Sequence, residues 1–362
     1  LKLRTRGRYD VRRNLSTVDG SASEWKNRLW TLTLDYDNPH VPIGFSLGRF
    51  LPQELGSIGY LDGGLLRVRL NDRWQAAVLV GRRPTWAYND NATMTLSRYG
   101  GYLSYHADIS NPLYIDQSFG GVLEYQEQIP SRSFFTWQGS VRQGAAYGMH
   151  HSVDIDVNRY WRKAKAGHLF TLSNLYLQGW LRATPALRLS LQYDNRQNFW
   201  TYELLTTVDS LFDARVRQGV RARADYRVTR RVRVNGSLSY RRTAGDRAPT
   251  VSYTAGVNES GVFRRRVHTS LSIFGFDGVD QHGFGYTLRG QLPPTEYGSP
   301  FFSVRGYSYA VDGQPDSRKS LSIEVGSSKD FVGGYYLSGS AEASFGDDIS
   351  GWRTTIEFGY RY

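Results

Sequence analysis

The chain of 362 residues contains no cysteine, only two methionines and only 12 prolines. The lack of cysteine excludes a disulfide framework, a thiolate zinc site and a catalytic thiol. No stretch approaches the roughly 18–20 consecutive apolar residues of a membrane-spanning helix, which excludes a helical membrane protein. Lysine is also scarce, because it supplies only six of the 45 basic residues, and the formal net charge is +12. Arginine in such excess suits carboxylates, phosphates and sulfates, although a GC-rich genome also favours it.

Aromatic residues are abundant, at 14% of the chain, and they occur in segments where apolar and polar residues alternate. Near the C-terminus, Trp352 and Ile356 alternate with Arg353 and Glu357. Residues 215–228 repeat the pattern, with valine, alanine and tyrosine on one face and arginine on the other. A period of two is typical of β strands whose two faces meet different surroundings.

We count about 20 such segments of roughly 9–13 residues, longer than the roughly 5–6 of soluble strands and close to the roughly 9–11 of transmembrane strands. Their connections alternate in length. The shorter ones lie near residues 71–73, 184–185, 229–231, 258–261 and 328–331, and the longer ones near 51–62, 85–92, 161–167, 198–211, 243–249 and 311–317. Short turns at one rim and long loops at the other are typical of outer-membrane barrels.

The sequence therefore predicts an all-β protein that forms a single closed antiparallel transmembrane β-barrel of about 20 strands, within roughly 18–22. Residues 1–362 would form one domain. A soluble all-β domain, with the arginine face in solvent, is the alternative. A β-propeller is disfavoured because no repeat of roughly 40–50 residues is visible.

The C-terminal strand resembles the one that the barrel-assembly machinery reads in Gram-negative outer-membrane β-barrels. The resemblance rests on Phe358, Tyr360 and Tyr362, although the strand has Glu357 where a glycine is usual. It covers the whole chain as a strand pattern and implies a bacterial outer-membrane location, a bilayer and lipopolysaccharide around the protein, and assembly by that machinery. The chain begins on an alternating segment without a secretory leader, so we expect a leader or an upstream segment before Leu1.

Arginine on the lipid face of a barrel costs about 2–4 kcal/mol at midplane, so the arginine faces should line the lumen. The predicted lumen and anion-binding residues are Arg215, Arg217, Arg221, Arg223, Arg227, Arg233 and Arg241, followed by Arg67 and Arg69. Charged rings select ions by sign, which predicts a channel for polar, preferably anionic, solutes. Alternatively, these arginines pair with lumen acids such as Asp194, Asp225, Glu324, Glu342 and Glu357.

A wide barrel without a plug would leak. The longest connection, 198–211, is a candidate constriction loop that carries Trp200, Tyr202, Glu203 and Asp209, and residues 51–62 are a second candidate. The alternative function is a sleeve or export conduit in a multiprotein outer-membrane complex. The partner in or below the lumen would be an acidic polysaccharide, a surface lipoprotein or an electron-transfer protein.

The sequence predicts no enzyme, cofactor or metal site, and no nucleic-acid partner. Adjacent His150 and His151 lack metal-ligand spacing and would point to opposite strand faces. The segment Gly44–Gly48 matches a nucleophile motif that requires a strand–turn–helix context, but it lies in an alternating strand. Asp154 and Asp156 are expected on a solvated surface rather than at a calcium site.

Overall fold

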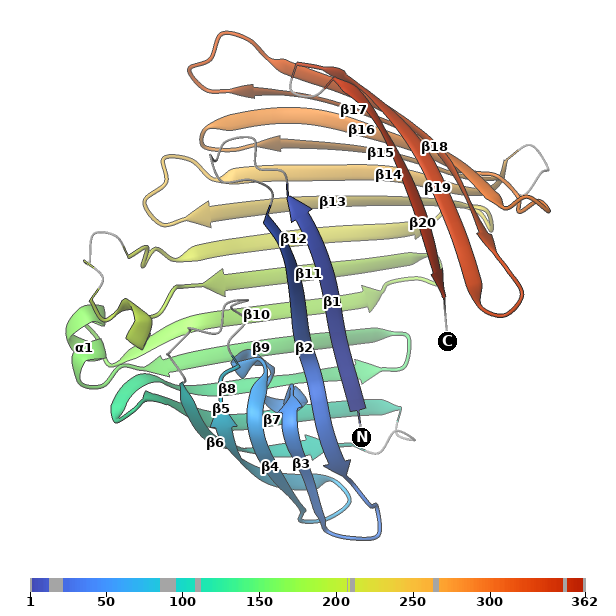
Figure 1. Ribbon diagram of the computed structural model, residues 1–362. Coiled ribbons are helices and arrows are strands. Elements are labelled where there is room, and N and C mark those ends of the chain that lie inside the picture. Colours follow the sequence, from blue (N-terminus) through green and yellow to red (C-terminus); the bar gives the residue numbers. More distant parts are fainter. Residues whose placement is uncertain are drawn as a thin grey trace. The chain divides into compact units, whose positions relative to one another are not determined.

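The computed structural model describes residues 2–12, 22–84, 96–107, 112–206, 208, 212–262, 267–347 and 350–360. It contains twenty β strands, one short α helix and two 3-10 helices (Figure 1). Every described strand pairing is antiparallel and joins neighbours in sequence. The predicted all-β class and the strand count are confirmed, whereas closure into a barrel stays a prediction. No helix in the described ranges is long and apolar enough to cross a membrane.

The chain divides into two compact units. Unit 1 consists of Leu1–Leu177 and Asn195–Val216, and unit 2 of Gln178–Asp194 and Arg217–Tyr362. Two of the three boundaries between the units fall inside strands β10 and β11, and the third lies directly before β12. The prediction of one domain over residues 1–362 therefore stays a prediction.

Unit 1 contains the first nine strands and all the helical segments. They are β1 (Lys2–Arg12), β2 (Ala22–Tyr36), β3 (Ile43–Phe50), η1 (Gln53–Ile58), β4 (Leu61–Arg69), β5 (Trp74–Arg82), β6 (Ser97–His106), β7 (Leu113–Gln126), β8 (Ile129–Gln143), β9 (Tyr147–Val157), α1 (Trp161–Ala166) and η2 (Tyr202–Leu204). The strands β10 (Phe170–Arg182) and β11 (Leu187–Arg196) belong partly to each unit.

Unit 2 continues with nine strands. They are β12 (Arg217–Arg227), β13 (Val232–Thr243), β14 (Thr250–Val262), β15 (Val267–Asp277), β16 (Gln281–Gln291), β17 (Ser299–Val311), β18 (Arg318–Asp330), β19 (Tyr335–Gly346) and β20 (Gly351–Tyr360). The predicted turn at residues 258–261 was wrong, because β14 runs through them. The one predicted near residues 328–331 lies slightly too early, because β18 continues to Asp330 and the connection begins at Phe331. The turns were misplaced since serine, asparagine and glycine also occur inside these strands.

In each unit the strands have an apolar face and a polar face. On the apolar face many large side chains are exposed, such as Val78 at 60% in unit 1 and Leu238 at 58% in unit 2. The polar face carries the neighbouring arginine, serine, threonine and asparagine residues. Because paired residues in antiparallel strands share a face, the register assigns the residues of β12–β20 discussed below to one of the two.

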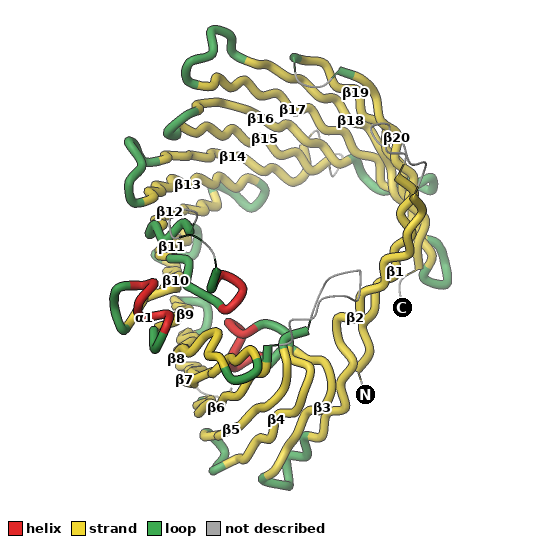
Figure 2. Tube along the Cα trace, turned by 60° about the vertical axis from the view of Figure 1, so that its left-hand side comes forward, coloured by secondary structure: helices red, strands yellow, loops and turns green. Residues whose placement is uncertain are grey.

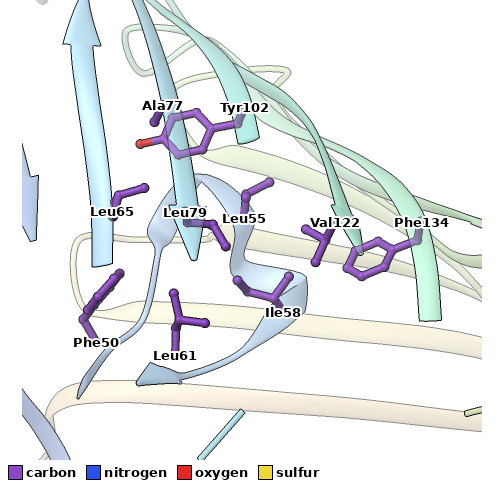
Figure 3. Packing of buried hydrophobic residues seen from close by; sticks show 10 residues of the cluster. All are labelled: Phe50, Leu55, Ile58, Leu61, Leu65, Ala77, Leu79, Tyr102, Val122 and Phe134. Atoms are coloured by element: carbon purple, nitrogen blue, oxygen red, sulfur yellow. The ribbon is translucent and has the colours of Figure 1, made fainter. Parts of the chain in front are cut away.

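Unit 1 has a buried hydrophobic cluster on its polar face, where the segment between β3 and β4 lies against β4–β8 (Figure 3). Leu55 of η1 is fully buried and Ile58 is 5% exposed. Gly120 lies directly beneath Leu55, because a Cβ atom at residue 120 would lie 2.6 Å from Leu55 Cδ2. Gln138 donates a hydrogen bond to the Gln53 carbonyl (2.6 Å), and Ser118 donates one to the Glu54 carbonyl (2.7 Å). Apolar burial and these hydrogen bonds together fix η1 on the strands (Figure 2).

We expect Leu55→Ala to lower the free energy of unfolding by about 2–5 kcal/mol, because it leaves a cavity in this cluster. Urea unfolding of the detergent-solubilised protein, followed by tryptophan fluorescence, measures the change. Leu51→Ala, four positions earlier and 44% exposed, is the control and should change little. Equal effects of the two substitutions would contradict the packing of η1 described above.

Candidate anion-binding site

Arginine side chains gather on the polar face of β12 and β13. Along β12 the face carries Arg217, Arg221, Arg223 and Arg227, and the register pairs Arg227 with Arg233 of β13. The opposite face of β12 carries valine, alanine and tyrosine. The alternation in sequence therefore places these arginines together without any help from a loop.

A pocket of about 880 Å³ opens on this face, at the end of the strands where residues 183–186 and 228–231 form short connections. All of its lining belongs to unit 2. Five of the lining residues are arginines, namely Arg182, Arg188, Arg223, Arg227 and Arg233. Asp225 is the one acidic residue among those that line it.

The aspartate does not neutralise the pocket. Asp225 accepts two hydrogen bonds from the guanidinium of Arg223, at 2.8 and 2.9 Å. The guanidinium of Arg188 lies 4.4 Å from the ring centroid of Trp180, and Arg227 donates to the Pro185 carbonyl (3.2 Å). Within the described residues, Arg182, Arg188, Arg227 and Arg233 form no ion pair with a carboxylate. The pocket therefore has excess positive charge and free guanidinium donors, which suit carboxylates and phosphates.

The structure brings only three of the predicted arginines into the pocket: Arg223, Arg227 and Arg233. Arg217, Arg221 and Arg241 share the polar face but lie farther along the strands. Arg215 was wrongly placed in this strand, because β12 begins at Arg217, and its side chain pairs with Asp213 at 2.9 Å.

The two second-tier arginines lie in unit 1 and are held by local contacts. Arg67 donates a hydrogen bond to the Ser46 hydroxyl (2.8 Å). Arg69 forms an ion pair with Asp37 and donates to the Asn38 carbonyl (2.7 Å). Arg69 thus fixes the connection between β2 and β3.

Sequence analysis missed Arg182, Arg188 and Trp180 as pocket residues. The sequence contained a signal for them. Trp180 and Arg182 lie on one face of β10 with Leu181 between them, and Arg188 follows the Thr184–Pro185 turn. This signal was not used because four separate segments of chain build the pocket, and their register with one another is not visible in any one strand.

Three other acidic residues of unit 2, Glu324, Glu342 and Glu357, have partners outside the pocket. Glu342 accepts hydrogen bonds from Arg305 and Arg353, both at 2.6 Å, and Glu324 lies 3.5 Å from Arg305. Glu357 accepts a hydrogen bond from the Tyr336 hydroxyl (2.6 Å). On β17–β20 the arginines are therefore paired with glutamates, whereas the five arginines of the pocket share a single aspartate.

The candidate constriction residues lie in unit 1 and pack against its wall. The ring of Trp200 is buried and stacks on Phe212 with centroids 3.8 Å apart, and the Tyr202 amide donates to the Ser131 hydroxyl (3.0 Å). Glu203 forms an ion pair with Arg83. Burial raises the pKa of Glu203, but hydrogen bonds and the charge of Arg83 outweigh it and hold the pKa below its usual value. Asp209 lies outside the described residues.

A buried ionic network holds this segment and α1 on the strands of unit 1. Asp156 of β9 is fully buried, accepts two hydrogen bonds from Arg132 (both 2.9 Å) and one from Arg162 (2.8 Å). Arg162 also donates to the Trp200 carbonyl (2.9 Å). Burial lowers the pKa of the Arg162 guanidinium, and the charge of Asp156 opposes that effect. The expectation that Asp154 and Asp156 lie on a solvated surface was wrong, because both are buried and the guanidinium groups of Arg132 and Arg162 cover Asp156.

The remaining predicted groups are placed as follows. Phe358 and Tyr360 lie exposed on the apolar face of β20, while Tyr362 is outside the described residues. Gly44–Gly48 lies inside β3, which is not a nucleophile-elbow context. Among the residues that the structure describes, no group of three or more histidine or acidic side chains could hold a metal ion.

No protein-family model matches this chain, and no curated protein matches it. Among solved structures, one mutant of the porin of Rhodopseudomonas blastica is similar, with a TM-score of 0.32 and 11% identity over 70% of this chain and 91% of that chain. A second mutant of that porin gives a TM-score of 0.33 and 10% identity over 76% of this chain and 98% of that chain. Values this low carry no argument about the activity of this chain.

We expect Asp156→Asn to lower the free energy of unfolding by about 3–5 kcal/mol, because it leaves Arg132 and Arg162 buried without their carboxylate. The control is Asp225→Asn, whose pair with Arg223 is exposed and should contribute about 1 kcal/mol or less. Urea titrations of the two variants beside the parent protein give both values. A smaller loss for residue 156 than for residue 225 would contradict the buried network.

Proposed function

We propose that the chain is a channel of the bacterial outer membrane that passes polar, preferably anionic, solutes. The twenty strands would close into one barrel over residues 1–362, with the apolar face toward lipid and the polar face around an aqueous lumen. The exposed apolar side chains support this assignment, because a soluble sheet gains nothing by exposing them in a continuous band. Apart from β3 with 8 residues, the strands have 9 to 15 residues and so reach the roughly 9–11 that a tilted transmembrane strand needs.

The observation that carries the proposal is the arginine pocket of unit 2. Its five arginines and one aspartate leave a positive field on the polar face. Charge of one sign on a pore wall raises the local concentration of the opposite ion. Enrichment of anions at the short-turn end is the function that this geometry supports best.

The packed segments of unit 1 would narrow the lumen. Both η1 and the segment with Trp200, Tyr202 and Glu203 cover strands on the polar face. Because hydrophobic burial and charged hydrogen bonds fix them there, they would act as a permanent constriction rather than as a mobile lid. No enzymatic step is part of this proposal.

The proposed surroundings follow from the same assignment. The apolar face would contact the bilayer and lipopolysaccharide, and the barrel-assembly machinery would read Phe358, Tyr360 and Tyr362. The alternative is a conduit filled by a protein or polymer partner. A stoichiometric partner that co-purifies with the protein, together with a closed pore in its absence, would favour that alternative.

The triple variant Arg223→Gln, Arg227→Gln, Arg233→Gln should lose anion preference, because it removes three of the five positive charges of the pocket. We expect the anion-to-cation permeability ratio to fall several-fold, measured as the reversal potential across a planar bilayer in a KCl gradient.

The matched control is Arg242→Gln, which changes an arginine on the other face of β13, opposite Gln218. Its reversal potential should stay near that of the parent. Cation preference in the parent, unchanged in the triple variant, would refute anion selectivity, and absence of any conductance would refute an open channel.

A further inference from the structure

On the polar face of unit 2, arginine, hydroxyl and aromatic side chains follow one another in a fixed order from strand to strand. Simple attraction of anions does not require such an order. In the register, Arg223 of β12 pairs with Ser237, Ser237 with Thr254, and Thr254 with Phe274 of β15. Phe274 pairs with Gly285, and Gly285 with Tyr307 of β17. These paired residues share one face, so they form a row across six strands. At about 4.8 Å per strand the row is about 24 Å long.

The neighbouring row repeats the same order. Its members are Arg221, Ser239, Ser252, Phe276, Gly283 and Tyr309. Each row thus begins with arginine, continues with two hydroxyl residues and ends with two aromatic residues separated by a glycine. We call the two rows together the track.

The hydroxyl groups of the track are already aligned. Ser237 and Thr254 are hydrogen-bonded at 2.8 Å, and Ser239 and Ser252 at 2.6 Å. A hydroxyl that takes part in one such bond still has acceptor capacity for a ligand. The middle of the track can therefore exchange hydrogen bonds with a ligand rich in hydroxyl groups.

The aromatic end of the track is flat because of its glycines. A Cβ atom at Gly285 would lie 2.4 Å from the Phe274 ring, and one at Gly283 would lie 2.8 Å from the Phe276 ring. The rings cover the bare glycines, which stabilises the sheet. Phe274 and Tyr307 nevertheless remain 37% exposed. Tyr307 and Tyr309 are stacked with centroids 6.0 Å apart.

At its arginine end the track meets the pocket, because Arg223 belongs to both. The pocket adds side-chain amides and a tryptophan ring, which the track does not have. Trp180 contributes a further aromatic ring, and Gln178, Asn235 and Asn258 contribute amides that both donate and accept hydrogen bonds. The arginines are not all gathered at one point, because Arg223 and Arg227 lie four positions apart on β12, a span of about 13 Å, while Arg227 pairs with Arg233 of β13. Guanidinium groups at this spacing match repeated carboxylates better than they match one compact phosphate group.

We propose that this face of unit 2 binds acidic oligosaccharides, that is, chains of sugar rings that carry carboxylates. Guanidinium groups bind the carboxylates, hydroxyl and amide groups bind the sugar hydroxyls, and aromatic rings contact the apolar faces of the sugars. A volume of about 880 Å³ for the pocket lies in the upper part of the roughly 300–1,000 Å³ that ligand sites occupy. This inference rests on the proposed channel, since it names the class of anion for which the lumen is built.

Isothermal titration calorimetry of the detergent-solubilised protein with a galacturonic acid hexamer tests the proposal without requiring a pore. Two comparison ligands separate the contribution of the sugar rings from that of the carboxylates. A glucose hexamer has sugar rings without charge, and a glutamic acid hexamer has carboxylates without sugar rings. We expect the galacturonate to bind at least tenfold more tightly than either of them.

The double variant Phe274→Ala, Tyr307→Ala should weaken galacturonate binding about tenfold and leave the reversal potential in KCl unchanged. Its control is Phe284→Ala, Tyr286→Ala, which removes two aromatic rings from the apolar face of β16 and should leave binding unchanged. Heat-modifiable migration on gels confirms that each variant is folded. Arg223→Lys with Arg227→Lys keeps the charge but loses the planar donors, so it should weaken galacturonate binding.

Equal binding of the glutamate and galacturonate hexamers, or no effect of the double aromatic variant, would overturn the proposal and leave a purely electrostatic wall. Tighter binding of ATP than of the galacturonate would assign the aromatic and arginine groups to nucleotides and would also overturn it. If the parent protein shows no anion selectivity but still binds galacturonate, the result would count against the proposed channel and not against the binding site.

Discussion

The period of two in β strands is the constraint on which the rest of this structure depends. Each strand must place successive side chains on opposite faces, so the sequence of β12 cannot put its valines and its arginines in one environment. The antiparallel register then extends that separation from strand to strand, because paired residues share a face. The arginine pocket, the aromatic ends of the track and the exposed apolar band are all consequences of this alternation in unit 2.

Alternation is a local property, and for that reason the sequence predicted it well. The number of strands and the two faces of β12 and β13 follow from residues within one segment. Turn positions were less secure, since Asn258–Gly261 has turn-forming residues but lies in β14. There the pairing with β13 and β15 outweighs the local preference.

Contacts between separate structural elements could not be predicted. Asp156 has the sequence context of an exposed strand residue, yet Arg162 of α1 and Arg132 of β8 bury it. The packing of η1 depends on Gly120, about sixty residues away along the chain, which leaves space for Leu55. Arg182 and Arg188 line the pocket together with residues of β12, β13 and β14. Each case requires knowledge of which segments meet, and one sequence without relatives does not contain it.

The most direct test of the account is cysteine accessibility along β12 in proteoliposomes, because the chain has no cysteine of its own. Single cysteines replace Val220, Ala222 and Ala224 on one face, and Arg221, Arg223 and Asp225 on the other. We predict that a water-soluble maleimide labels the odd-numbered positions rapidly, and that the even-numbered positions react only with a lipid-soluble reagent. Rapid labelling of all six positions by the water-soluble reagent would mean that both faces meet water, and would contradict a membrane-spanning strand with an aqueous polar face.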